Sequence, residues 1–437
     1  MMRYCIILLL CLRLVASGYS QSTYFPPTIG TTWATLAPSE LGWCQPNIDS
    51  LYHFLETNNT KAFILLKDGK IVLEKYFAAH TASTPWYWAS AGKSLTAFMV
   101  GLAQQDDYLS IRDKTSEYLG RGWTTCSPEQ EDRITIWHQL TMTSGLDDRV
   151  PNPDCTLDTC LRFRADAGTR WAYHNAPYTL LDGVIENATG MTLNAYITQK
   201  LRGSTGITGT FIKLDYNNVF FSTARSMARF GLLILNKGTW NGTPIMQDSA
   251  YFYQMTHTSQ ALNKAYGYLW WLNGTDNYMI PQTQFVFNGY MSPHAPADMI
   301  AALGKNGQFI NVVPSQNMVW IRMGDAPDGL PVPFLLNDQI WQYLNDLACN
   351  PVSASGTPSS QTTTRIFPNP ATKSIRIQSN QEITRLEIYA PQGRMIRFEN
   401  IQSNDYHLNI KGLPRGLFVL KIYHKDDSIR SERMIKW

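Results

Sequence analysis

Charged residues are scarce in this 437-residue chain. Asp, Glu, Lys and Arg make up 16% of it and leave a formal net charge of +3, whereas an average globular protein has about 25% charged residues. This near balance argues against a dedicated nucleic-acid-binding protein, which usually carries a basic stripe. Hydrophobic residues make up 44% and aromatic residues 12%, so the chain can form a large core and is not intrinsically disordered.

Several catalytic motifs are missing as well. The eight histidines form neither His-x-His nor His-Glu-x-x-His, and the seven cysteines form no Cys-x-x-Cys, so no metal site or redox motif is indicated. The sequence contains no Gly-x-Ser-x-Gly elbow and no Gly-rich phosphate-binding loop. We therefore expect chemistry without a metal or an organic cofactor.

Long hydrophobic runs are absent except at the N-terminus. Arg3 precedes the apolar run from Ile6 to Leu12, and mostly small residues follow up to Ser20. This pattern is typical of a secretory signal peptide, so we assign residues 1–20 to one. An N-terminal anchor helix is the alternative, but the run is too short to cross a bilayer. We expect a mature protein without a transmembrane segment.

The cysteines are compatible with export. Five remain after residue 20: Cys44, Cys126, Cys155, Cys160 and Cys349. Two disulfides and one free thiol are possible in an oxidising compartment, with Cys155 and Cys160 closing a short loop and Cys44 joining Cys349. Buried unpaired thiols are an equally good interpretation.

A linker divides the chain into two folded parts. Residues 352–364 (VSASGTPSSQTTT) are small, polar and uncharged, as in flexible linkers. Residues 365–437 carry 13 Lys and Arg against 7 Asp and Glu, which sets them apart from the region 21–351. Short apolar runs separated by turn residues predict a small all-β sandwich, with strands at Ser374–Gln378, Arg385–Tyr389, Tyr406–Ile410 and Leu417–Tyr423.

The region 21–351 combines strand and helix patterns. Two hairpins are predicted, one at 62–76 around Asp68-Gly69 and one at 309–323. Apolar residues at helical spacing predict helices near 95–102, 180–185 and 227–235. The two hairpins could pair in one antiparallel sheet flanked by helices, which predicts an α+β fold.

Ser90 and Lys93 form the only Ser-x-x-Lys of the sequence, and this spacing places both side chains on one face of a helix. A lysine with a lowered pKa can activate a serine nucleophile. Alone, the pair is a weak signal, because a serine that caps the helix and a solvated lysine would explain the same spacing better.

A second motif lies about eighty residues downstream. Tyr173 and Asn175 alternate in an extended segment and should point the same way, with His174 between them pointing away as a structural residue. A phenol can relay a proton, and a side-chain amide can hold a substrate amide or ester.

Together the two motifs resemble the serine β-lactamase and penicillin-binding superfamily, in its class C-like branch. That branch includes esterases and 6-aminohexanoate-dimer hydrolases. The resemblance runs from about residue 60 to 341. It implies that Ser90 is acylated, that Lys93 and Tyr173 share its proton, and that Asn175 orients the substrate.

The third motif of this superfamily, usually Lys-Thr-Gly, departs from the pattern. Alignment places Ala302-Leu303-Gly304 there, followed by Lys305, whose backbone N–H would complete an oxyanion hole with that of Ser90. If the alignment slips, the Lys305 side chain could instead replace the missing cation. Loss of the polar residues favours esters or neutral amides.

The tail resembles a known sorting signal. Phe367-Pro-Asn-Pro370, the segment around Gln392-Gly393, Leu413-Pro-Arg-Gly416 and Lys436 follow the order seen in C-terminal sorting domains of the type IX secretion system of Bacteroidota. A carbohydrate-binding or adhesion sandwich is the alternative. The resemblance implies type IX secretion machinery as a partner and a secreted or cell-surface location.

These observations predict a secreted serine hydrolase that acts on small-molecule esters or amides. A β-lactamase or D-Ala-D-Ala carboxypeptidase is the enzymatic alternative. An acyl-trapping sensor or binding module without turnover is the alternative of another class.

Overall fold

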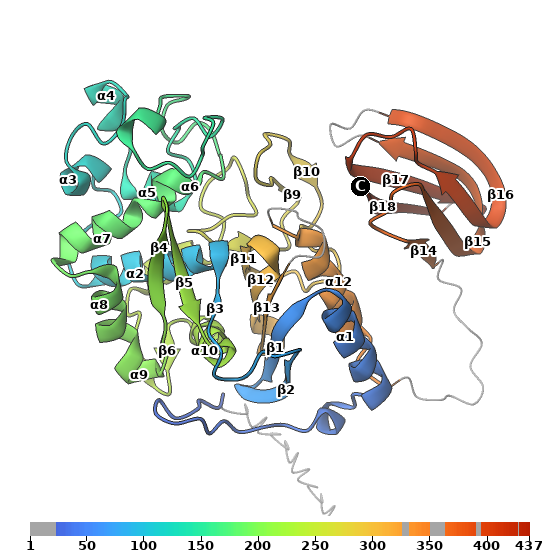
Figure 1. The fold of residues 1–437 in the computed structure, drawn as a ribbon, viewed down its shortest axis with the longest axis horizontal. Helices are drawn as coiled ribbons and strands as arrows, with labels where there is room; N and C mark the ends of the chain where they lie inside the picture. Colours follow the sequence, from blue (N-terminus) through green and yellow to red (C-terminus); the bar gives the residue numbers. More distant parts are fainter. Residues whose placement is uncertain (1–22, 326–331, 350–362, 390–394, 427) are drawn as a thin grey trace, which may run out of the picture.

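The computed structural model describes residues 23–325, 332–349, 363–389, 395–426 and 428–437 (Figure 1). The predicted signal peptide and residues 352–362 of the predicted linker lie outside these ranges. Across the described part of the chain, every helix is too short or too polar to span a membrane.

A six-stranded antiparallel sheet forms the centre of the larger part, and both predicted hairpins lie in it. In spatial order its strands are β2 (Lys70–Tyr76), β1 (Thr60–Lys67), β13 (Met318–Gly324), β12 (Gln308–Val313), β11 (Ile300–Gly304) and β8 (Trp271–Leu272). Strands β1 and β13 pair directly, with Leu65 opposite Trp320. The pairing of the two hairpins is therefore confirmed.

Helices cover both faces of this sheet, which explains why every residue of β12 and β13 is buried. On β13, Val319 faces Gly231 of α10 (Ala224–Leu235), where a Cβ atom would come 2.5 Å from the valine. The next residue, Trp320, packs its ring at 5.8 Å from Trp341 of α12 (Phe334–Asn345). Since neighbouring strand residues point to opposite faces, α10 and α12 lie on opposite sides.

The remaining elements surround this core (Figure 1). Helix α1 (Gln45–Thr57) packs beside α12, and α2 (Gly92–Gln105), buried along most of its length, packs against α7. The other helices are α3 (Thr115–Leu119), α4 (Pro128–Glu131), α5 (Ile136–Leu140), α6 (Asn175–Thr179), α7 (Leu181–Thr189), α8 (Leu193–Ile197), α9 (Gly203–Thr205) and α11 (Ser249–Met255). A three-stranded sheet contains, in spatial order, β3 (Trp86–Tyr87), β5 (Asn217–Ser222) and β4 (Thr210–Leu214). Two further sheets are pairs of short strands: β6 (Thr239–Trp240) with β7 (Thr243–Pro244), and β9 (Asn277–Tyr278) with β10 (Phe287–Asn288).

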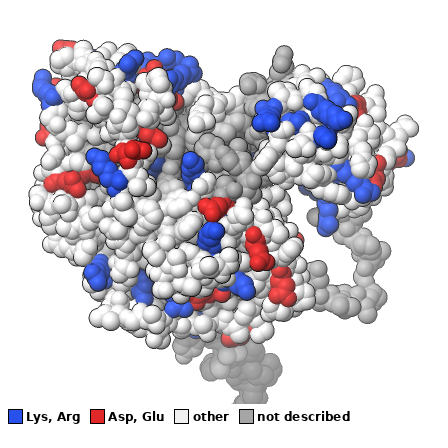
Figure 2. Space-filling model, viewed as in Figure 1, with Lys and Arg blue, Asp and Glu red and all other residues white. Residues whose placement is uncertain are grey.

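The C-terminal strands form one curled all-β sheet with its own apolar core. Figure 2 shows several Lys and Arg side chains on its visible face. The strands are β14 (Thr364–Phe367), β15 (Ser374–Tyr389), β16 (Met395–Asn409), β17 (Gly416–His424) and β18 (Ile429–Lys436).

Several details of this sheet differ from the sequence prediction, among them that β14 was not predicted and that β16 begins at Met395 instead of Tyr406. The predicted strands 374–378 and 385–389 are one strand, β15, which continues through polar residues with a shift in register between Gln378 and Ile383. Strand β18 was not predicted, because its charged residues mask the alternation of apolar side chains.

The cysteines form the two pairs that the sequence allowed. Cys44 bonds to Cys349 and Cys155 bonds to Cys160, with Cα atoms 5.0 and 5.9 Å apart. Cys126 is the free cysteine of the described residues. The first bond joins α1 to the end of the α12 region, and the second closes a short loop.

Candidate active site

Ser90 lies on a tight turn at the entrance to α2. The turn is a short 3₁₀ helix, η2 (Ala89–Ala91), and Ala89 has a φ of 47°. A non-glycine residue in this left-handed region is strained, and such strain clusters at functional sites. Ser90 is half-buried, and its Oγ accepts a hydrogen bond of 3.0 Å from Lys93 Nζ. The predicted pair is thus in direct contact.

Lys93 is enclosed in the protein with only 4% of its surface exposed. Burial lowers the pKa of its ammonium group to about 7, while the carboxylates of Asp154 and Asp182 partly oppose this shift. The nitrogen also lies 4.1 Å from the ring centre of Tyr178 and 5.2 Å from that of Tyr173. Near neutral pH a large fraction of Lys93 is therefore unprotonated and can accept a proton.

Tyr173 lies beside the same pair. Burial raises the pKa of its phenol well above the ordinary value, while a hydrogen bond with Ser90 acts in the opposite direction. The ring stacks on Trp271 at 5.5 Å and meets Tyr266 edge-on at 6.2 Å. These aromatic contacts hold a neutral phenol next to the serine.

Asn175 is the first residue of α6 and is tied to an acidic residue. Its Nδ2 donates to Asp154 Oδ1 at 2.7 Å, while its Oδ1 is buried and accepts no hydrogen bond from the described residues. His174 is buried, and burial lowers its pKa to about 4. Neither of its ring nitrogens has a hydrogen-bond partner among the described residues.

Two acidic residues near Lys93 were missed by the sequence analysis. Asp154 precedes Cys155 in an irregular loop, where no pattern marks it. Asp182 lies in α7 and is buried, which raises its pKa to about 7; its Oδ2 accepts from Asn218 Nδ2 at 2.8 Å. Asp182 could have been identified from the sequence, because it is a lone acidic residue within the apolar stripe around Leu181 and Val184.

Gly304 ends β11 directly against the serine turn. A Cβ atom at this position would lie 2.5 Å from Trp88 O and 3.2 Å from Ser90 N, so only glycine allows this approach. Lys305 follows with an exposed side chain. The turn after it, η5 (Lys305–Gly307), is held by buried Arg322, which donates to Asn306 O and Gly307 O at 3.1 and 2.7 Å.

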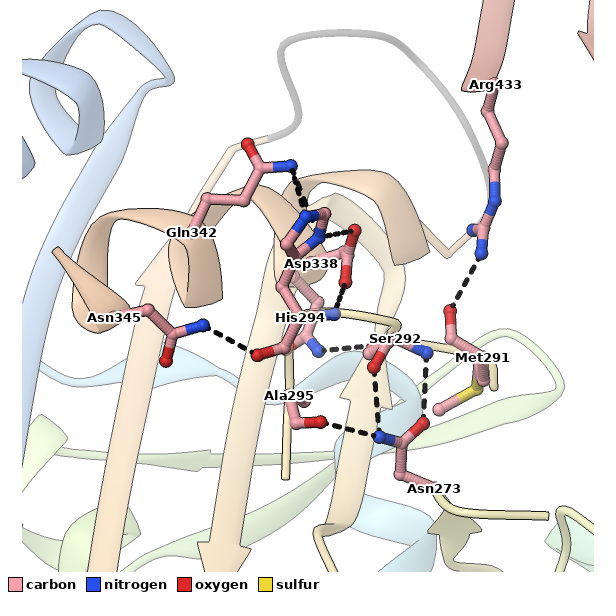
Figure 3. A network of polar contacts seen from close by, with 10 residues as sticks. Asn273, Met291, Ser292, His294, Ala295, Asp338, Gln342, Asn345 and Arg433 are labelled. Atoms are coloured by element: carbon pink, nitrogen blue, oxygen red, sulfur yellow. Dashed lines mark hydrogen bonds and ion pairs between the residues drawn. The ribbon is translucent and has the colours of Figure 1, made fainter. Parts of the chain in front are cut away.

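A polar network holds the segment that leads into β11 (Figure 3). Asn273 Nδ2 donates to Ser292 O at 2.9 Å and Ala295 O at 3.3 Å, and Ser292 N donates back to Asn273 Oδ1 at 3.0 Å. Asp338 of α12 accepts from the backbone N–H of His294 at 2.9 Å and lies 2.9 Å from its ring. In the same view, Arg433 of β18 reaches Met291 O at 3.5 Å.

Among the residues that the structure describes, no group of three or more His, Cys, Asp or Glu side chains is arranged to hold a metal ion. The chemically active groups of the site are the hydroxyl, amine, phenol and amide already described.

The family model for beta-lactamase matches residues 59–344, which include Ser90, Lys93, Tyr173 and Gly304. The chain belongs to the beta-lactamase family. This match confirms the family resemblance, and the sheet flanked by helices confirms the α+β fold expected from the sequence. Beta-lactamase-family proteins of this fold are serine hydrolases. A second model, for a secretion-system C-terminal sorting domain, matches residues 365–436 and indicates export to the cell surface or beyond.

Solved structures share the fold of this beta-lactamase-family chain. One, described as a 6-aminohexanoate-dimer hydrolase from Bacillus anthracis, is 18% identical with a TM-score of 0.54, covering 74% of this chain and 91% of that one. An octameric penicillin-binding protein homologue from Pyrococcus abyssi is 14% identical with a TM-score of 0.55, covering 90% and 99%. A family VIII carboxylesterase is 12% identical with a TM-score of 0.52, covering 70% and 99%.

A curated relative matches a shorter part of the chain. Protein flp of Staphylococcus aureus is 24% identical over 176 residues, which span 36% of this chain and 35% of that protein. The match therefore covers about a third of the relative's length.

Proposed function

We propose that the chain is an exported serine hydrolase that cleaves carboxylic esters or small amides through an acyl-enzyme on Ser90. The observation that carries this proposal is the hydrogen bond of 3.0 Å between the side-chain nitrogen of buried Lys93 and Ser90 Oγ. Burial lowers the pKa of Lys93 to about 7, and a lysine tuned in this way can act as a general base at neutral pH.

In the first step, Ser90 Oγ attacks the substrate carbonyl carbon and its proton passes to Lys93 Nζ. The tetrahedral intermediate then expels the alcohol or amine, which takes up a proton by way of Lys93 or the Tyr173 hydroxyl. Water hydrolyses the acyl-enzyme, with the same groups accepting its proton and returning one to Ser90. Tyr173 acts as a neutral relay, since its raised pKa disfavours a phenolate.

The oxyanion of the intermediate needs two N–H donors. We assign these to the backbone of Ser90 and of Lys305, because Gly304 brings the end of β11 against the serine turn. Arg322 supports this assignment by holding the carbonyls of the turn that follows.

The substrate class follows from the third motif. Ala302 and Leu303 are buried apolar residues and offer no side-chain group to a substrate carboxylate. The side chain of Lys305 is exposed. Esters and neutral amides, which lack a carboxylate, fit this site better than penicillins or peptides ending in D-alanine.

The test is hydrolysis of p-nitrophenyl butyrate by the full chain, its Ser90→Ala variant and a control, Ser39→Ala, at an exposed serine of a 3₁₀ turn. We expect steady turnover that falls by a factor of about 10³ or more in Ser90→Ala alone. One equivalent of p-nitrophenol followed by no further release would indicate the acyl-trapping alternative. Turnover that survives in Ser90→Ala would overturn the mechanism.

A further inference from the structure

The residues just before the loop closed by Cys155 and Cys160 contact the Tyr-x-Asn motif. Asp154 Oδ1 accepts from Asn175 Nδ2 at 2.7 Å, and Pro153 O accepts from the backbone N–H of Ala176 at 3.2 Å. Two successive loop residues thus contact two successive residues at the start of α6. This contact was not visible in the sequence, because the residues are separated by an irregular segment.

The loop itself is restrained on both sides of Asp154. Asn152 Oδ1 accepts from Asp154 N at 3.1 Å, and Asn152 O accepts from Cys155 N at 3.2 Å. The disulfide between Cys155 and Cys160 begins at the next residue. The carboxylate is therefore held by a turn and a covalent bridge, which limits its freedom to move away from Asn175.

The chemistry of the contact fixes which way the Asn175 amide faces. An ionised carboxylate only accepts hydrogen bonds, whereas a side-chain amide has a donor end and an acceptor end. Asn175 must therefore turn its NH₂ group toward Asp154 and its oxygen away. That oxygen is buried and has no hydrogen-bond partner among the described residues, so the contact with Asp154 is the side-chain hydrogen bond that sets the orientation of the amide.

We propose that Asp154 is a positioning residue that locks the Asn175 amide in one orientation for the reaction at Ser90. The role rests on the proposed hydrolase function and deepens it, because Asn175 is the residue assigned to orient the substrate. Without the carboxylate, the amide could rotate by half a turn and exchange its donor and acceptor ends. The site would then present the wrong group in a fraction of the molecules.

The charge of Asp154 has a second, separable effect. It favours the protonated form of Lys93, so its removal should move the acid limb of the pH–rate profile to lower pH. Asp182 of α7 acts on Lys93 in the same direction, and Tyr173 and Tyr178 face the ammonium with their rings. At a pH well above 7, where Lys93 is unprotonated, this charge effect disappears and only the orientation effect remains.

The experiment is a double-mutant cycle on the full chain with p-nitrophenyl butyrate and its amide analogue, p-nitrobutyranilide. The variants are Asp154→Ala, Asp154→Asn, Asn175→Ala and the Asp154→Ala/Asn175→Ala double variant. The matched control is Asp158→Asn, at an exposed acid inside the nearby disulfide-closed loop, whose Oδ1 accepts from the neighbouring Thr159 N–H at 2.7 Å. The kcat/KM is compared at about pH 9, on the plateau of the profile, and thermal unfolding verifies folding.

We expect Asp154→Ala to lower kcat/KM about tenfold or more and Asp154→Asn to lower it less, because an asparagine keeps the contact but allows both orientations. In the Asn175→Ala background, Asp154→Ala should cause no further loss. Asp158→Asn should match the wild type. The inference would be overturned if Asp154→Ala lowered kcat/KM by the same factor in the Asn175→Ala background as in the wild type. An unchanged kcat/KM in a folded Asp154→Ala variant would overturn it as well. Absence of any Ser90-dependent turnover would instead refute the proposed function.

Discussion

Gly304 lies against the backbone of Ser90 so closely that a side chain cannot fit between them. A Cβ atom at Gly304 would come 2.5 Å from Trp88 O, 2.9 Å from Ala91 N and 3.2 Å from Ser90 N. All three are backbone atoms of the serine turn, which cannot move aside as a flexible side chain would. The last residue of β11 and the proposed nucleophile are therefore positioned by each other.

This contact predicts the effect of Gly304→Ala. The added methyl group should push β11 away from the serine turn, costing about 1–3 kcal/mol of unfolding free energy and lowering kcat with p-nitrophenyl butyrate. The control is Gly203→Ala, at a helical position where a Cβ atom meets nothing within 4 Å. Urea unfolding and ester hydrolysis measure both effects, and a fully active, equally stable Gly304→Ala would contradict the prediction.

The pH dependence of activity should follow Lys93. Its pKa is lowered to about 7 by burial, and the unprotonated amine is the form that accepts the serine proton. We expect kcat/KM to rise about tenfold per pH unit below 7 and to level off above it, because the unprotonated fraction follows that course. Rates measured from about pH 5 to 9 check this, and a flat profile would exclude Lys93 as the base.

The same residue should destabilise the folded protein. Because the native pKa is lower than the unfolded one, the unfolded state binds more protons between about pH 7 and 10.5, and stability rises with pH across this window. We expect Lys93→Met to be more stable than the wild type by up to about 5 kcal/mol below pH 7, with the gain shrinking as the pH rises toward 10.5.

The comparison is made by urea unfolding of both proteins at several pH values, beside Lys264→Met at an exposed lysine. Only the difference between variant and wild type is interpreted, since groups away from the site titrate equally in both; the carboxyl of Asp182, whose pKa Lys93 helps to lower, is the exception. A difference that does not change with pH would mean that Lys93 is not held in a depressed-pKa environment.

Much of the central sheet could be predicted because its signals are local. Asp68 and Gly69 have φ angles of 52° and 78°, as the Asp-Gly turn between β1 and β2 requires. The apolar runs on either side then define the strands. The assignment of Gly304 to the third motif rests on the family resemblance and on no local pattern.

The contacts that tune the site could not be predicted, because they join distant segments. Asp154 reaches Asn175 across twenty-one positions of irregular chain, and Asn218 of β5 reaches Asp182 of α7. Neither contact follows a helix or strand period. The sequence analysis divided β15 into two strands for a related reason. Polar residues in the middle of a strand resemble a turn, and the pairing with β16 that shows the strand to be continuous is not visible in the sequence.

Arg322 holds the turn that follows Gly304 through hydrogen bonds to its carbonyls. Its replacement by lysine should therefore lower both stability and activity. The side chain is fully buried and donates to Thr60 Oγ1 at 2.9 Å and to the carbonyls of Asn306, Gly307 and Asp325 at 3.1, 2.7 and 3.1 Å. A guanidinium group reaches these dispersed acceptors at once, whereas a single ammonium nitrogen cannot.

We expect Arg322→Lys to lose at least about 2 kcal/mol of unfolding free energy, because each buried carbonyl left without a donor costs about 1–3 kcal/mol. It should also lower kcat with little change in KM, since the loosened turn carries the N–H of Lys305 assigned to the oxyanion. Arg121→Lys, at a side chain that is 70% exposed, is the control and should behave like the wild type. If Arg322→Lys kept both full stability and full activity, the turn would depend on some other residue for its shape.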